Sequence, residues 1–183
     1  MKVWILSGTI DIGNEILNYD NVQQGLDIIK FIGRSRVSIQ KSWNAVSINS
    51  IEKGEKLDFH KELRVPILSK DAVQVIQELI KDMAEILPLI HPDREYFVLN
   101  ILNIIDCIDE SKIQFTSYPT GTIKAYTKWE FKKEMVAGQH IFKATYHTVR
   151  DVPVDIIFVS DEFVEKVEKS KLKGFYFTEV WNG

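Results

Sequence analysis

The densest cluster of polar side chains with chemical potential is the segment N-I-I-D-C-I-D-E, residues 103–110. Carboxylates three residues apart, Asp106 and Asp109, could bind a metal ion, and Cys107 beside an acid could act as a nucleophile. A nucleophilic cysteine needs a base or a positive charge to lower its pKa, whereas acidic neighbours raise it. The alternating oxygen ligands and central glycine of a calcium-binding loop are also missing. We therefore interpret the segment as a strand end that runs into an Asx-type turn, with Cys107 as a small buried hydrophobic residue, and we expect no metal site.

Histidines and glycines add no catalytic or phosphate-binding pattern. The four histidines are scattered, and no pair has the helical or strand spacing of a zinc site. The glycines are too widely spaced for a phosphate-binding loop, and the sequence GxxxxGK[ST] is absent. We expect no cofactor and no catalytic residues. An enzymatic alternative would need a site assembled from distant residues, such as Cys107 with a histidine.

Composition limits the class of protein. The 183 residues fit one domain, residues 1–183, and the net charge of −3 argues against a dedicated nucleic-acid binder or an electrostatic membrane anchor. A single cysteine excludes an internal disulfide and fits a reducing compartment. The first apolar run is too short for a secretory signal, and no window approaches the roughly 20 apolar residues of a membrane span. These features predict a soluble cytoplasmic protein.

The last quarter of the chain predicts a strand, a capped helix and a second strand. Residues 156–159 are β-branched or aromatic, and Ser160 can accept a hydrogen bond from a helix N–H. Two acids follow in the first turn, lysines crowd the last turn, and Gly174 can adopt the left-handed conformation that ends many helices. We expect this helix over residues 160–173 and an aromatic strand over residues 175–181.

A similar pattern occurs earlier, at residues 65–83. VPILSKDAVQVI resembles IIFVSDEFVEKV in having an extended apolar run, a serine cap and an amphipathic helix, predicted over residues 69–83. We interpret this similarity as one local strand-to-helix arrangement that occurs twice. Further strands are expected at residues 2–6, 86–90, 96–105, 113–118, 123–131 and 140–145, and one or two strands are expected within residues 37–51. The prediction is an α+β fold with a mixed, mainly antiparallel sheet and two capped amphipathic helices.

Three segments carry a resemblance to a known family: YFVLNILNIIDCIDESKIQF, WEFKKEMVAGQHIFKA and IIFVSDEFVEKVEKSKLKGFYFTEVW. They resemble a family of bacterial immunity proteins from polymorphic toxin systems, long filed as a domain of unknown function. The family rhythm N-x-x-N-x-x-D-x-x-D is matched by Asn100, Asn103, Asp106 and Asp109, and its closing motif by residues 157–177. The resemblance covers about residues 65–181. It divides the chain into an N-terminal subregion, residues 1–64, and a family-like core, residues 65–183.

The resemblance implies an immunity protein without enzymatic activity, which binds a cognate toxin domain and blocks it by steric and electrostatic occlusion. It supplies no catalytic residues. An acidic inhibitor could fill the basic cleft of a toxin that acts on nucleic acid. Candidate contacts are Asp109, Glu110 and Glu179, chosen for expected exposure near strand or turn ends. Trp181 near the terminus is a fourth, with a role as a lid on the core as its alternative.

Two other readings remain beside the first. One is an enzyme with a site built from distant residues, and the other is a small-ligand-binding module with an apolar pocket. We expect no direct contact with nucleic acid and none with a membrane.

Overall fold

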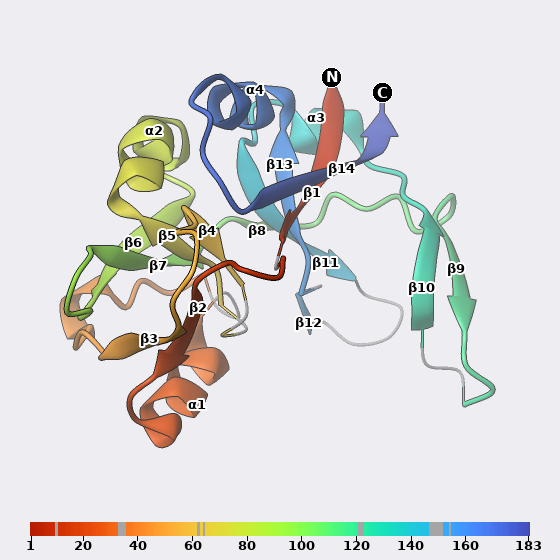
Figure 1. Cartoon of the computed structure of the whole chain (residues 1–183). Helices are drawn as coiled ribbons and strands as arrows, with labels where there is room; N and C mark the ends of the chain where they lie inside the picture. Colours follow the sequence, from red (N-terminus) through yellow and green to blue (C-terminus); the bar gives the residue numbers. More distant parts are fainter. Residues whose placement is uncertain are drawn as a thin grey trace.

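Strands dominate the computed structural model, which describes residues 1–9, 11–32, 36–61, 63, 65–120, 123–146, 152–153 and 155–183 (Figure 1). In chain order the elements are β1 (Lys2–Gly8), β2 (Ile16–Tyr19), α1 (Val22–Phe31), the 3-10 helix η1 (Gln40–Ser42), β3 (Ile48–Glu52), β4 (Phe59–His60), β5 (Ile67–Ser69), α2 (Lys70–Ile80), β6 (Ala84–Leu89), β7 (Tyr96–Ile101), β8 (Ile104–Ile105), β9 (Gln114–Ser117), β10 (Ile123–Lys128), α3 (Lys133–Val136), β11 (Ile141–Tyr146), β12 (Val152–Pro153), β13 (Ile157–Ser160), α4 (Asp161–Lys169) and β14 (Phe175–Asn182). One sheet has the order β4-β5-β7-β6, and a second has the order β12-β11-β13-β1-β14 with β8 beside β11. Most pairs are antiparallel and β8 is parallel to β11, which confirms the predicted α+β fold.

The first capped helix, α2, lies within a unit formed by β4, β5, α2, β6 and β7, which we call the first unit. The hydroxyl of Ser69 accepts the N–H of Ala72 at 3.2 Å, as an N-cap does. The helix ends at Ile80 rather than at the predicted residue 83. The N–H of Met83 donates to the carbonyl of Ile80 in a turn that leads into β6, and the carbonyl of Met83 accepts the N–H groups of Leu102 and Asn103.

The second capped helix, α4, lies within a unit formed by β11, β13, α4, β14 and β1, which we call the second unit. The hydroxyl of Ser160 accepts the N–H of Phe163 at 3.3 Å. The helix ends at Lys169, four residues before the predicted end. Lys171 and Gly174 both have positive φ, at 55° and 89°, so the turn into β14 begins earlier and Gly174 supplies its left-handed residue.

The two units share one topology. In each, a capped helix connects two strands, and a third strand lies between these two and pairs antiparallel with both. The registers agree as well, since the N-cap residue Ser69 pairs with Tyr96 and the N-cap residue Ser160 pairs with Val3. β4 and β11 extend the two sheets in the same way, antiparallel to β5 and β13. The likeness therefore goes beyond a local strand-to-helix solution used twice.

Connectivity distinguishes the units. β6 continues through a turn into β7, whereas β14 ends the chain and β1 begins it. The two chain ends are adjacent (Figure 1), and the N–H of Gly183 donates to the carbonyl of Met1 at 3.2 Å. The second unit is thus a circular permutation of the first. Its middle strand, β1, comes from the N-terminal subregion and pairs with strands of the family-like core, so the second sheet contains residues from both sides of the predicted division at residue 64. That division and the single domain stay predictions.

The strand predicted at residues 96–105 is two strands, in different sheets. β7 lies in the middle of the first sheet, between β5 and β6, and β8 pairs with β11 beside the second. The break falls at Leu102 and Asn103, whose N–H groups bond to Met83. Of the one or two strands expected at residues 37–51, one forms, β3, and it follows η1.

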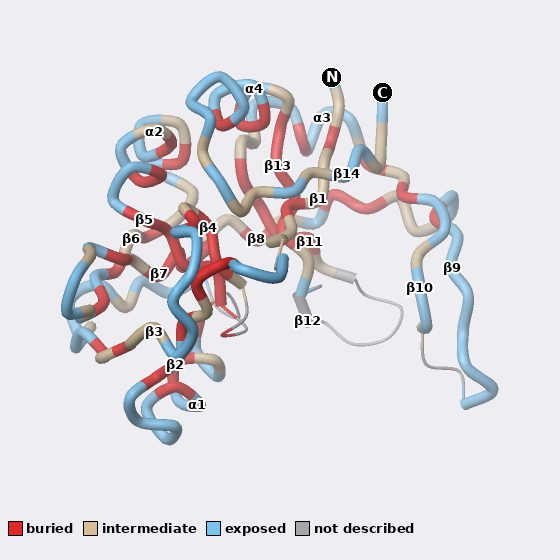
Figure 2. Tube along the Cα trace, in the orientation of Figure 1, coloured by how far each residue is buried: buried red, intermediate tan, exposed pale blue. Residues whose placement is uncertain are grey.

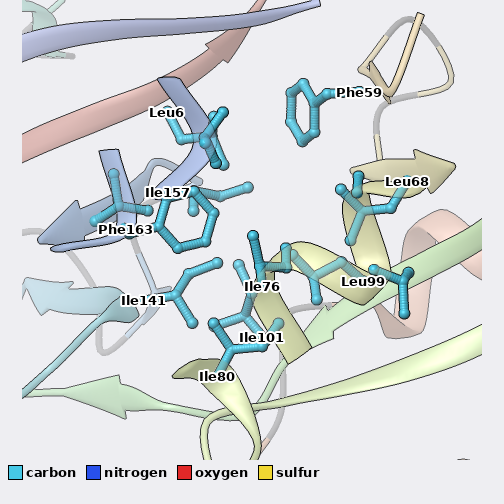
Figure 3. Packing of buried hydrophobic residues seen from close by; sticks show 14 of the residues in the cluster. Leu6, Phe59, Leu68, Ile76, Ile80, Leu99, Ile101, Ile141, Ile157 and Phe163 are labelled. Atoms are coloured by element: carbon cyan, nitrogen blue, oxygen red, sulfur yellow. The ribbon is translucent and has the colours of Figure 1, made fainter. Parts of the chain in front are cut away.

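One apolar cluster joins the two units, and Figure 3 shows its side chains meeting from both. We call it the central cluster; it includes Ile76 of α2, Phe163 of α4, Leu99 of β7 and Ile157 of β13. A second cluster packs on the other face of the first sheet under α1, β2 and β3, and a third packs on the other face of the second sheet. Both faces of each large sheet are covered, which explains their nearly continuous apolar strands.

None of the helices in the described ranges combines the length and apolar composition that crossing a membrane requires.

Candidate functional site

The two asparagines of the predicted polar rhythm connect distant elements. Asn100 is buried and donates from Nδ2 to Oε2 of Glu85 at 2.9 Å. Asn103 donates from Nδ2 to Oε1 of Gln139 at 2.8 Å and to the carbonyl of Ile141 at 2.9 Å. Asn103 thus stabilises the crossing from the first sheet to the second.

The two aspartates of the rhythm stabilise the turns that follow. Asp106 forms an ion pair with Lys132 at 3.2 Å. Asp109 accepts the N–H and hydroxyl of Ser111, at 3.3 and 2.6 Å, which confirms the Asx-type turn. Lys112 lies 2.8 Å from Asp109, and this cation and the Ser111 hydrogen bonds lower the pKa of Asp109 to about 2.

Cys107 lacks the environment of a nucleophile. Its side chain is buried, as predicted. Burial and the neighbouring Asp106 raise the pKa of the thiol to about 12, so it remains protonated near neutral pH. A thiol in that state neither attacks a substrate nor binds a metal ion.

A buried polar cluster that the sequence did not indicate lies between β7 and β3. Glu15 accepts the hydroxyls of Ser50 and Tyr96, both at 2.6 Å. Burial alone would raise the pKa of Glu15, but these hydrogen bonds and the nearby His60 and His91 together lower it below its ordinary value of 4.5. Only the pairing of distant segments brings these residues together.

The serine and the histidine in this cluster do not have the hydrogen-bond direction of a catalytic pair. Nε2 of His91 lies 3.1 Å from the Ser50 hydroxyl, while its Nδ1 accepts the N–H of Asp93 at 3.2 Å. A neutral imidazole that accepts at Nδ1 carries its proton on Nε2, so the ring donates to Ser50 and Ser50 donates to Glu15. A general base would have to accept that serine proton instead.

A second contact of serine with histidine involves the cap of α4. The Ser160 hydroxyl lies 3.0 Å from Nδ1 of His140, and its oxygen also accepts the N–H of Phe163 as the helix cap. His60 is buried with its ring edge-on to Tyr96, and His147 lies outside the described residues. In the part of the chain that the structure describes, no three His, Cys, Asp or Glu side chains converge closely enough to bind a metal ion.

Three of the four predicted contact residues lie near one another, around Glu130. The N–H of Asp109 donates to the carbonyl of Glu130 at 2.9 Å, and Glu110 follows in the chain. Nε1 of Trp181 donates to Oε1 of Glu130 at 3.2 Å. Trp181 is half-buried with its ring against Phe131, so it covers the third cluster and also reaches the surface. We call Asp109, Glu110, Glu130 and Trp181 the acidic corner.

Glu179, the fourth predicted contact, lies on the opposite face of the sheet. It forms an ion pair with Lys2 at 2.6 Å, on the side where Trp4 packs against the central cluster. Residues two apart normally share a face of a strand. The register between β1 and β14 shifts between Val3 and Trp4, and this bulge puts Glu179 and Trp181 on different faces.

The most exposed element pair is an arm formed by β9 and β10, which projects from the body (Figure 1) and is largely exposed along its length (Figure 2). All residues of β9 are exposed, and Phe115 and Tyr118 are 43% and 51% exposed. In the described ranges, the two strands of the arm pair only with each other. β9 lacks the apolar run of the other strands, a signal that could have marked it as a free hairpin.

A series of aromatic rings attaches the arm to the body. Phe115 contacts Tyr126 with ring centroids 6.4 Å apart, Tyr126 contacts Trp129 at 4.2 Å, and Trp129 contacts Phe158 of β13 at 5.0 Å. Trp129 and Phe158 are buried in the third cluster. A two-stranded ribbon is marginally stable alone, so this aromatic series fixes the orientation of the arm.

Two of the grooves on the described surface have aromatic side chains in their walls. The one at the base of the arm has a volume of about 440 Å³, and its apolar lining is Ile5, Ile123, Ala125, Tyr126, Trp129 and Ile156. The other has a volume of about 450 Å³ and lies between α1 and residues 39–46, with Phe31 and Trp43 in its wall. The second groove is the feature on which a small-ligand-binding alternative would rest.

Comparison with known proteins gives one family. The model of the Immunity protein family (Imm11) matches residues 88–182, slightly more than half of the chain. The matched range contains the acidic corner and the arm. No curated protein matches the chain.

Proposed function

Because the chain belongs to the Imm11 immunity protein family, we propose that it binds a cognate toxin domain of a polymorphic toxin system and neutralises it in the cytoplasm. The observation that carries the proposal is the family match over residues 88–182. The matched range contains β7 of the first sheet, every strand of the second sheet except β1, and the layer that covers the second sheet, so it is a folded surface and not a short motif.

The proposed mechanism is occlusion without chemistry. The described side chains support it, because the Cys107 thiol is held protonated and the Ser50 hydroxyl is oriented as a donor to Glu15. Tight occlusion needs about 1,200–2,000 Å² of buried surface with a few dominant side chains at its centre.

We propose the acidic corner as part of the contact, with Asp109, Glu110 and Trp181 meeting the toxin together. Glu179 reaches the same partner only if the interface wraps around β14, which is the edge strand of the second sheet. Asp109 and Glu179 already have lysine partners within the chain, so reversing their charges changes local pairing as well as any contact with the toxin.

The decisive experiment is neutralisation by titration. The toxin domain encoded beside this gene, or one captured by a pull-down from the native cell, is expressed under an inducible promoter with and without this chain. We expect growth rescue and a stable complex. With purified proteins, toxin activity should fall linearly and reach zero at one equivalent, because occlusion is stoichiometric. An enzyme that inactivates the toxin would abolish toxin activity far below one equivalent, and that result would replace occlusion by the catalytic alternative.

A second arm of the experiment tests Cys107 directly. Cys107→Ala should leave rescue intact at the cost of modest stability, since the thiol serves as a buried apolar group. Loss of rescue by a folded Cys107→Ala variant would contradict a role without chemistry.

A further inference from the structure

We propose that the arm of β9 and β10, with the groove at its base, is the main binding surface for the toxin domain. The toxin places a large apolar side chain in the groove and a carboxylate beside Lys124. This inference rests on the proposed function, because it names where the same partner binds and which chemistry it presents.

The shape of the arm suits insertion into a partner. It stands away from the body (Figure 2), so a concave surface can close around both of its faces. The aromatic series from Phe115 to Phe158 holds it in one orientation before binding. A preordered element loses less conformational entropy on binding than a flexible loop, which favours high affinity.

The side chains of the arm are those that dominate binding surfaces elsewhere. Phe115 and Tyr118 are exposed large rings, and Thr116 and Ser117 between them offer hydroxyls. Aromatic side chains supply contact area at a low entropy cost, and small hydroxyl residues supply adaptable hydrogen bonds. The same ring types are enriched among residues that contribute most to binding.

Charge identifies the chemistry of the partner. Residues 111–129 contain three lysines and no acid, although the whole chain has a net charge of −3. Lys112 and Lys128 are paired at the base of the arm with carboxylates 2.8 and 3.3 Å away. Lys124 lies instead over the ring of Tyr118, at 5.9 Å from its centroid, and a ring does not neutralise the ammonium charge. A carboxylate on the toxin complements this position.

The groove supplies the apolar half of the contact. Lys124 and Ala125 line it on the arm side, and Ile5 and Ile156 line it on the side of the second sheet. Its volume of about 440 Å³ falls within the range of roughly 300–1,000 Å³ typical of binding pockets. Strand addition to the arm is the less suitable mode, because the β9-β10 register shifts twice and such irregularities disrupt a pairing edge.

The test compares variants of the arm with matched variants elsewhere, using the full chain and the toxin domain identified by growth rescue. Phe115→Ala removes an exposed ring, Lys124→Glu reverses the charge, and Ala125→Arg fills the groove. The controls are Tyr176→Ala, an exposed ring on β14, and Lys166→Glu, an exposed lysine on α4. Dissociation constants and association rates are measured by surface plasmon resonance at low and high salt, and thermal melting establishes that each variant is folded.

Each arm variant should raise the dissociation constant at least tenfold, and both controls should stay within twofold of the wild type. Lys124→Glu should also slow association and reduce its dependence on salt. If the wild type rescues growth and every folded arm variant has a dissociation constant within twofold of the wild type, this inference is overturned and the immunity function stands. Failure of the wild type to bind or rescue would remove both. Loss of self-association or of oligonucleotide binding in the arm variants, with toxin binding unchanged, would assign the arm to a second copy of the chain or to nucleic acid, against the proposal.

Discussion

The first and second units have the same topology, yet they cover their outer faces with different chemistry. On the first unit, the buried carboxylates Glu15 and Glu85 accept hydrogen bonds from side chains and backbone around them. On the second unit, the outer layer is aromatic, with Trp129 and Phe131 packed on the sheet and the arm growing from it. A repeated framework thus sets the core, and the layer added to each copy determines what that copy can do.

The largest effect should come from the cluster that the two units share. Phe163→Ala in α4 and Ile76→Ala in α2 each leave a cavity in the central cluster, which should lower the free energy of unfolding by about 3–5 and about 2–5 kcal/mol. Because the cluster joins the units, urea unfolding should remain one transition in both variants. Two transitions, with only the mutated unit destabilised, would show that the units fold independently.

The glycines that follow α4 and α3 should differ strongly in their tolerance of a side chain. Gly174 has φ of 89°, and a Cβ there would collide with the carbonyl oxygen of Phe59 in the first unit. Gly174→Ala should therefore cost about 2–3 kcal/mol in unfolding free energy. Gly138→Ala is the matched control, since Gly138 also has positive φ but open space around it, and should cost about 1 kcal/mol. Equal losses in chemical denaturation would refute a close approach between the units.

Acid should loosen the outer layer of the first unit before that of the second. Burial would raise the pKa of Glu15 and Glu85, but the hydrogen bonds they accept lower it below the ordinary value of 4.5. Their stabilisation is therefore present above about pH 4.5 and is lost as the pH falls through the lowered values. Hydrogen exchange measured between about pH 5 and pH 3 should show β2, β3 and η1 losing protection first.

A control variant tests whether ionisation of Glu15 causes this acid sensitivity. Glu15→Gln cannot ionise, so its unfolding free energy should vary less with pH than that of the wild type, with a loss of about 1–3 kcal/mol at neutral pH. Simultaneous loss of protection in both outer layers would contradict the difference between them.

The smallest effect should separate the two helix caps. Ser160→Ala removes the cap of α4 and should cost about 1 kcal/mol. Ser69→Ala removes the cap of α2 and also the hydrogen bond to Asp58 at 2.7 Å, whose carboxylate pairs with Arg94, so its cost should approach about 2 kcal/mol. Thermal denaturation of the two variants measures which one loses more stability, and a greater loss of stability in Ser160→Ala would contradict the prediction.

Local chemistry was sufficient for the helix starts and the turn after Cys107. Ser69 and Ser160 cap their helices as predicted, and Asp109 forms its Asx-type turn, because each bond joins residues two or three apart. The predicted immunity protein family was likewise confirmed, by the match over residues 88–182, whereas residues 65–87 of the range in which the resemblance was seen lie outside that match. Proposed contacts at Asp109, Glu110, Glu179 and Trp181 stay predictions.

The tertiary structure alone decided which strands are neighbours. Nothing local to residues 2–8 indicates that β1 lies between β13 and β14, or that the strand predicted over residues 96–105 divides between two sheets. The opposite facing of Glu179 and Trp181 depends on a bulge in that same pairing. Sequence determines helix caps and turns because their hydrogen bonds are local, whereas sheet order and register depend on bonds between segments up to the whole chain apart.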